Sequence, residues 1–216
     1  MFIAPFRSPH KISVTQEYGN KTNNSWYLQN GIDIPFHNGI DVVFDNDTPK
    51  STFGTECVCP FDSAVVKVTW NDTHSTKGNG VTIQSQPIDG FIYQVVFWHT
   101  CELAVKEGDV LKKGDVVCYI GNSGLCKPER GILSPFNGAH CHLMVFKYVP
   151  GVNGNWVLKN GQNGVQGAID PRELFDFTKC EVGVDTGLSR DMWAFSDYVS
   201  WMTPEIIVKY FRYLGL

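Results

Sequence analysis

Short runs of alternating apolar and polar residues recur along most of this chain, at intervals of roughly ten residues. Such alternation places successive side chains on opposite faces, as in a β-strand with one buried face. Glycine, aspartate and asparagine separate the runs and are typical of turns. The pattern predicts strands at about 12–18, 40–44, 56–59, 63–70, 80–86, 91–99, 116–120 and 140–148. It therefore predicts a mainly β fold, a small antiparallel barrel or sandwich.

The pattern becomes helical only after residue 170. Asp170 is a cap residue and Pro171 suits the first helical position, so a short helix is predicted to begin there. Residues 189–202 and 203–214 carry apolar side chains at helical spacing. These two segments predict a pair of helices at the C-terminal end.

A chain of 216 residues has room for one sizeable domain and an appendage. We expect a β domain over residues 1–178 and a helical appendage over 179–216. The appendage would cover one face of the barrel or contact a protein partner. Within the β domain, a repeated element ending in Gly-Asp, with Gly108 and Gly114 at its two turns, predicts a tight corner.

Composition excludes several classes of protein. Hydrophobic residues make up 43% of the chain and charged residues 19%, which favours a buried core over disorder. A net charge of −4 argues against nucleic-acid binding, and the lack of a long apolar run argues against membrane insertion. The first residues lack the order of a signal peptide, so we expect a location in the cytoplasm of the producing cell or in a virion. Seven cysteines, an odd number, are expected to be reduced thiols.

The candidate chemistry lies in two short segments. His140 and His142 are two residues apart in a predicted strand, so both side chains point to the same face. His37 precedes another predicted strand, and Asp41 follows it by four residues. Three of these groups could supply the three protein ligands of an open Zn²⁺ site. The alternatives are that Asp41 only caps a turn and that His99, after an apolar run, is an ordinary core histidine.

Several segments, in order along the chain, resemble the lysostaphin/LytM-type zinc endopeptidases of bacterial cell walls. The segment beginning at His37 resembles their H-x-G-[IV]-D-[IV] motif, and the segment beginning at His140 resembles their H-[LI]-H-F-E-V strand. Residues 78–83 are similar to a G-N-x-V-x-I strand, and the segment ending at His99 is similar to their D-G…Y-x-H-L region. The resemblance extends from about residue 12 to residue 177.

The resemblance implies which residues hold the metal and which handle protons. It makes His37, Asp41 and His142 the Zn²⁺ ligands, and it places His99 and His140 beside them to handle the water and the tetrahedral intermediate. This chain has Phe97, Thr100 and Met144 where the family has Tyr, Leu and Glu. None of the three differences removes a ligand, and the loss of the Glu bears on how the ligands are oriented.

The expected function is Zn²⁺-dependent hydrolysis of peptide bonds in the peptidoglycan stem or cross-bridge, by a protein that a phage could encode. Two alternatives belong to other classes. A non-catalytic relative would bind the wall or a partner, but such proteins usually lose ligands and this chain keeps all five positions. A phosphocarrier, whose barrel the corner at residues 105–121 also resembles, needs a nucleophilic histidine such as His99 or His140. The chemistry of a phosphocarrier does not require the pair His37 and Asp41.

Overall fold

The computed structural model describes residues 1–21, 29, 35–44, 52–73, 75–126, 136–161 and 163–180. Within these ranges the chain is mainly β, as predicted, and every predicted strand is present with ends that differ by a few residues. The strands are β1 (Phe2–Ile3), β2 (Phe6–Arg7), β3 (Ile12–Gln16), β4 (Ile40–Phe44), β5 (Glu56–Val58), β6 (Ala64–Trp70), β7 (Asn79–Ser85), β8 (Ile92–Leu103), β9 (Val110–Leu111), β10 (Val116–Ile120), β11 (Cys141–Pro150), β12 (Trp156–Leu158), β13 (Ala168–Ile169) and β14 (Phe175–Asp176).

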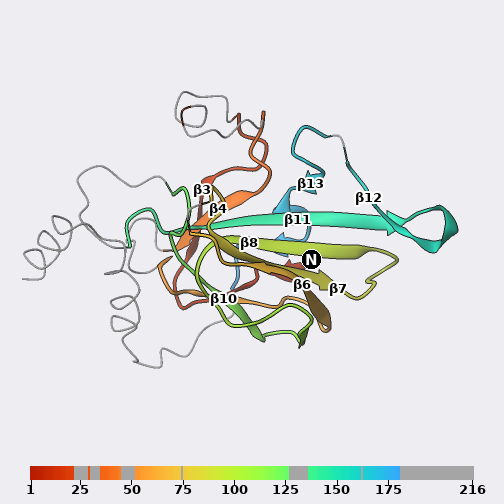
Figure 1. The fold of residues 1–216 in the computed structure, drawn as a ribbon, viewed down its shortest axis with the longest axis horizontal. Helices are drawn as coiled ribbons and strands as arrows, with labels where there is room; N and C mark the ends of the chain where they lie inside the picture. The colour runs from red at the N-terminus through yellow and green to blue at the C-terminus, as the bar shows by residue number, and fades with distance from the viewer. Residues whose placement is uncertain are drawn as a thin grey trace, which may run out of the picture.

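Twelve of the strands form one antiparallel sheet around the long strands β8 and β11, which lie side by side at its centre (Figure 1). Its main path runs β2-β5-β10-β8-β11-β4-β3, and β7, β6 and β9 continue from the other side of β8. The sheet curls into an open half-barrel, because its path ends at β2 and β3 instead of closing on itself. Separately, β1 pairs in parallel with β14 and so ties the first residues to the last described strand.

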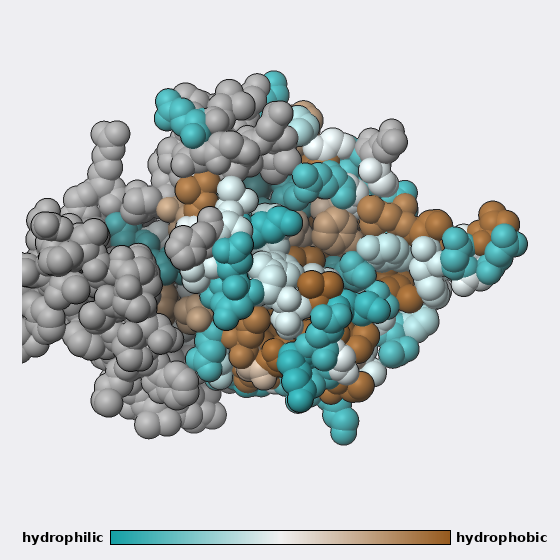
Figure 2. Space-filling view, in the orientation of Figure 1, coloured by the Kyte–Doolittle hydropathy of each residue, from teal (hydrophilic) through white to brown (hydrophobic). Residues whose placement is uncertain are grey.

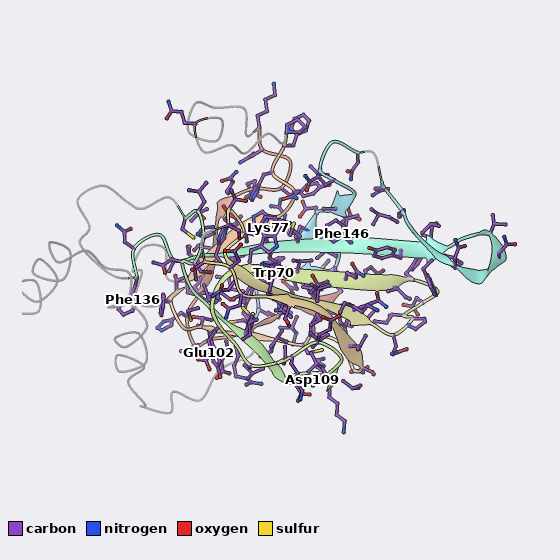
Figure 3. All side chains as sticks on the ribbon, in the orientation of Figure 1. Trp70, Lys77, Glu102, Asp109, Phe136 and Phe146 are labelled. Carbon is purple, nitrogen blue, oxygen red and sulfur yellow. The ribbon has the colours of Figure 1, made fainter. Side chains whose placement is uncertain are left out.

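The core lies inside the curl of the sheet, and strand β4 shows how it sets the direction of the functional side chains. Ile40, Val42 and Phe44 are fully buried, so the alternate residue Asp41 points to the opposite face. Trp70 on β6 and Phe146 on β11, labelled in Figure 3, mark the two strands that flank the β7–β8 pair. The period-two pattern of the sequence therefore decides which residues are available for chemistry.

The predicted corner is present and is built from two similar turns. The backbone N–H of Lys106 donates to Asp109 Oδ2 at 3.0 Å, and the N–H of Lys112 donates to Asp115 Oδ2 at 2.8 Å. Gly108 lies in the left-handed region with φ of 90°, which a residue without a Cβ adopts at little cost. The repeated Gly-Asp element thus marks a repeated turn between β8 and β10.

The short helix expected at Asp170 is one turn of 3-10 helix, Pro171–Glu173, and the Asp170 side chain accepts a hydrogen bond from the Arg172 N–H. It ends early because β14 begins at Phe175 and places that side chain in the core. The helices predicted at 189–202 and 203–214 lie outside the described residues. Among the described residues, no helix is long and apolar enough to cross a membrane.

Strands β11 and β12 form a hairpin that reaches beyond the body of the sheet (Figure 1). Apolar residues lie along it in Figure 2, and Val152, at the turn, is 83% exposed. The N-terminal end of the same strand β11 carries the candidate histidines, so the hairpin tip and the candidate site lie at opposite ends of one strand.

Candidate metal centre

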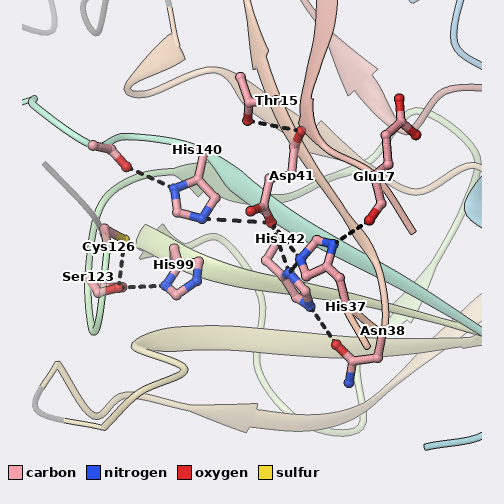
Figure 4. A network of polar contacts seen from close by, with 11 residues as sticks. Thr15, Glu17, His37, Asn38, Asp41, His99, Ser123, Cys126, His140 and His142 are labelled. Carbon is pink, nitrogen blue, oxygen red and sulfur yellow. Dashed lines mark hydrogen bonds and ion pairs between the residues drawn. The ribbon is translucent and has the colours of Figure 1, made fainter. Parts of the chain in front are cut away.

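Pairing between β4 and β11 brings the two distant sequence segments together. Asp41 and His142 are direct partners across the two strands, and their side chains point toward each other (Figure 4). His37 precedes β4, where its backbone N–H donates to the Asn20 carbonyl at 2.8 Å and its own carbonyl accepts from the Gly19 N–H. Between them, Gly39 lets the two backbones approach closely, because a Cβ at that position would collide with the Leu143 carbonyl oxygen.

Three ligand atoms meet at one point at this junction. His37 Nε2 lies 2.9 Å from His142 Nδ1, and Asp41 Oδ1 lies 2.9 Å from His142 Nδ1 and 3.2 Å from His37 Nε2. Tetrahedral Zn²⁺ with bonds of about 2.0–2.1 Å would separate its ligand atoms by about 3.3 Å. The arrangement is therefore close to the spacing that a tetrahedral metal ion needs.

The hydrogen bonds on the far side of each ring favour the tautomers that such an ion requires. His37 Nδ1 lies 3.1 Å from the Glu17 carbonyl oxygen, and His142 Nε2 lies 3.1 Å from Asn38 Oδ1. We assign a donated N–H to each of these contacts, since both partners are oxygen acceptors. The lone pairs of His37 Nε2 and His142 Nδ1 then face the Asp41 carboxylate, an arrangement that calls for a cation between them.

The protonation states of Asp41 and His142 also fit a metal site. Burial acts to raise the pKa of the Asp41 carboxyl, but the neighbouring histidines, His140 first, hold it well below its ordinary value. Burial lowers the pKa of His142. The site thus combines an ionised carboxylate with a neutral imidazole, which are the ligand states that Zn²⁺ binds.

His99 reaches this site through an irregularity in β8. The register between β7 and β8 pairs Asn79 with Thr100 and Gly80 with Trp98, and so skips His99. His99 has φ of 62°, which is unusual for a residue with a Cβ. This bulge allows two consecutive side chains to face one site: Trp98 stacks on His142 at 4.8 Å between ring centroids, and His99 lies 4.6 Å from His140.

His99 and His140 form a pair beside the three ligand atoms. His99 Nδ1 contacts the Ser123 carbonyl and His140 Nδ1 contacts the Gly138 carbonyl, both at 2.8 Å. Burial, followed by the neighbouring histidines, lowers the pKa of His99 to about 3. At His140, burial lowers the pKa but the Asp41 carboxylate raises it. The net result is a pKa raised to about 10. Two imidazoles in different environments are suited to different proton tasks.

The structure brings together all five residues that the sequence singled out, and it adds some that sequence reasoning missed. Asn38 contacts His142 and in turn donates from Nδ2 to Gln166 Oε1 at 2.9 Å. Asn38 adjoins His37 in the motif, so only its position hinted at a role. Cys126, which we expected to be an ordinary thiol, lies within 4.8 Å of ligand atoms of the paired histidines. The position of the missing Glu, Met144, is buried and apolar.

A comparison with protein-family models decides the family. The model of peptidase family M23 matches residues 35–165, which contain all five site residues. The chain belongs to peptidase family M23. It is therefore a zinc metallopeptidase, and His37, Asp41 and His142 form its candidate metal site.

Three solved structures illustrate what this M23 peptidase is similar to. LytU is 24% identical, with 74% of this chain and 81% of that chain covered and a TM-score of 0.47. The catalytic domain of the prophage-encoded M23 protein EnpA from Enterococcus faecalis is 22% identical, with coverage of 72% and 93% and a TM-score of 0.43. The catalytic domain of lysostaphin from Staphylococcus simulans is 18% identical, with coverage of 76% and 90% and a TM-score of 0.47. Among curated proteins, no sequence matches.

Proposed function

We propose that this M23 peptidase hydrolyses peptide bonds in the stem or cross-bridge of bacterial peptidoglycan. The observation that carries the proposal is the convergence of His37, Asp41 and His142 on one point, with the histidine pair beside it. The motif resemblance to cell-wall endopeptidases and the family match support this substrate. The place of action would be the bacterial wall, and a phage origin remains a prediction.

The three ligand atoms, we propose, hold the catalytic Zn²⁺. Bound Zn²⁺ supplies a Lewis acid that polarises a carbonyl and makes water more acidic. The chain contributes rigidity: the Glu17 carbonyl and the Asn38 side chain hold the two imidazoles in the required orientation. Trp98 covers one face of the His142 ring and restricts its movement.

The histidine pair divides the proton work in this proposal. Because each Nδ1 contacts a backbone carbonyl, Nε2 is the nitrogen of each ring that remains for proton transfer. A ring with a free Nε2 lone pair can accept a proton from the attacking water as general base. A ring that carries a proton at Nε2 can donate a hydrogen bond to the developing oxyanion. His99 and His140 together supply one group for each task.

Replacing the pair should separate metal binding from turnover. His99→Ala and His140→Ala should each keep the fold and the Zn²⁺ bound by His37, Asp41 and His142, while peptidoglycan cleavage falls by roughly 10²–10⁴-fold. Release of new amino groups from purified peptidoglycan measures cleavage, and metal analysis of the same preparations measures Zn²⁺. His10→Ala, at a histidine outside the site, is the matched control and should leave both quantities unchanged.

The same measurements separate the rival functions. A non-catalytic binder would release no amino groups in the wild-type protein, so there would be no turnover to lose. A phosphocarrier would take up phosphate on one of the paired histidines and cut no peptide. Undiminished cleavage in both His99→Ala and His140→Ala would refute the mechanism, even with Zn²⁺ bound.

A further inference from the structure

A second group of metal-ligating side chains lies directly beside the first. His99, Cys126 and His140, here called the second cluster, offer ligand atoms that all lie within 4.8 Å of one another. They come from the bulge in β8, the turn after β10 and the residue before β11. Figure 4 shows the three together, with Asp41 between this cluster and His37. The motif that identifies the family contributes the two histidines but not the cysteine.

The second cluster is held in place by the backbone. His99 Nδ1 contacts the Ser123 carbonyl oxygen at 2.8 Å, and Cys126 Sγ contacts the same oxygen at 3.5 Å. One carbonyl therefore anchors both the thiol and one imidazole. On the opposite side, the Gly138 carbonyl holds His140 at 2.8 Å. Each imidazole has one nitrogen engaged and one nitrogen available as a ligand.

Two imidazoles and one thiol are ligands that Zn²⁺ binds well. Three such protein ligands leave a fourth position for water, and the sulfur favours borderline or soft cations over Mg²⁺ and Ca²⁺. The first site, by contrast, contains two imidazoles and a carboxylate and no sulfur. We propose that His99, Cys126 and His140 form a second, inhibitory binding site for Zn²⁺ or a similarly soft divalent cation. As the metal binds, the thiol proton of Cys126 and the Nε2 proton of His140 leave to solvent.

The two sites are close enough to influence each other. His140 Nε2 lies 3.8 Å from Asp41 Oδ1, so one carboxylate stands between the two sets of ligands. Its negative charge favours a cation on either side. The second cluster is half-open, since His99 is buried whereas Cys126 and His140 are partly exposed. Solvent can therefore deliver an ion to the second cluster without opening the core.

Occupation of the second cluster has a direct consequence for the reaction, and this step rests on the proposed function. A metal ion there takes the ring lone pairs of both His99 and His140. Neither ring can then accept a proton from water or donate one to an oxyanion. Peptide cleavage should therefore rise as the first equivalent of Zn²⁺ binds and fall as the second equivalent binds.

A Co²⁺ titration of the metal-free, full-length protein tests the second site without relying on activity. Thiolate bound to Co²⁺ gives a charge-transfer band in the near ultraviolet, and among these two sites only the second contains sulfur. The wild-type protein should bind two equivalents and show the band. Cys126→Ser should lose the band and one equivalent. Cys101→Ser, which removes an exposed thiol on the same strand as His99, is the matched control and should retain both.

His37→Ala distinguishes failure of this proposal from failure of the proposed function. It should lose the first equivalent but keep the charge-transfer band, because His37 does not belong to the second cluster. One equivalent in the wild-type protein, or a band that survives Cys126→Ser, would overturn the second site. Two equivalents with no peptidoglycan cleavage at any Zn²⁺ concentration would support the second site and overturn the proposed function.

Discussion

At the scale of single residues, the metal centre depends on side chains that do not themselves bind metal. A histidine binds through one nitrogen only if the other nitrogen carries the proton, and a hydrogen-bond acceptor decides which one does. Here the acceptors are the Glu17 carbonyl for His37 and the Asn38 side chain for His142. Gln166 orients Asn38 by accepting from its amide nitrogen, so that the amide oxygen faces His142.

Asn38→Ala should weaken Zn²⁺ binding at the first site by roughly 10–100-fold, the usual effect of removing a partner that orients a ligand. The buried N–H of His142 would lose its acceptor, and the tautomer with Nδ1 free would be less favoured. Asn38→Asp keeps an oxygen at the same place and should recover most of the affinity. Competition with a chromophoric chelator measures both values. Equal affinity in the wild type and in Asn38→Ala would show that Asn38 does not orient His142.

Replacing a direct ligand should weaken Zn²⁺ binding more than replacing a residue that orients a ligand. We expect one strongly bound Zn²⁺ per chain in the wild type, and we expect its loss in His37→Ala, Asp41→Ala and His142→Ala. Each change removes one of the three atoms that meet within 3.2 Å. Metal analysis after dialysis against metal-free buffer gives the stoichiometry. If all three variants kept their strongly bound Zn²⁺, the ligand assignment would be wrong.

At the scale of elements, the close approach of β4 and β11 brings the ligands together. Asp41 and His142 face each other because the two strands pair in a single register, which runs from Cys141 with Val42 to Leu143 with Ile40. Gly39 lies where the chain enters β4, against the backbone of Leu143. A side chain at this position would separate the segment that carries His37 from the strand that carries His142.

Gly39→Ala should therefore lower the free energy of unfolding by about 1–3 kcal/mol, the usual cost of adding a methyl group to a filled space. It should also weaken Zn²⁺ binding, because the added Cβ moves His37 relative to β11. The matched control is Gly161→Ala, where the Cβ would meet no atom within 4 Å and the effect should stay within about 0.5 kcal/mol. Urea unfolding of the metal-free proteins measures both. Equal stability of the two variants would contradict the role assigned to Gly39.

At the scale of the whole molecule, the described residues, which lie between residues 1 and 180 with gaps, contain both metal clusters, and direct contacts join the two ends of this range. The Phe2 N–H donates to the Leu174 carbonyl at 2.8 Å, and β1 pairs with β14. Phe175 is buried in the core, and the Cys180 thiol contacts the Ser8 carbonyl. These contacts tie the first residues of the chain to the last residues that the structure describes.

A chain that ends at residue 180 should fold and retain its strongly bound Zn²⁺. A chain that ends at residue 170 should not, because it lacks β14 and leaves the core without Phe175. Circular dichroism and metal analysis of both truncated proteins make the comparison. A folded 1–180 protein without metal would show that residues 181–216 belong to the metal-binding domain, against the predicted boundary at 178.

Local patterns in the sequence already determined the strands, the repeated turn at Gly108 and Gly114, and the candidate ligands. Period-two alternation directly reports which face of a strand is buried, and in β4 the buried Ile40 and Val42 leave Asp41 on the opposite face. His37 and His142 were found because each lies in a short motif that resembles a motif of a known family. The short helix expected at Asp170 is present as one turn of 3-10 helix, and its cap residues do not reveal that Phe175 must enter the core.

Only the tertiary structure decided which atoms meet. Hydrogen bonds such as those from His142 to Asn38, and from Asn38 to Gln166, join residues more than a hundred positions apart. The bulge at His99 likewise follows from the register of β7 against β8 and leaves no local signal in the sequence. Cys126 joins the histidine pair for the same reason, because the turn after β10 returns beside β8 and β11. A periodic pattern records burial, whereas a site depends on contacts between strands that are distant in the chain.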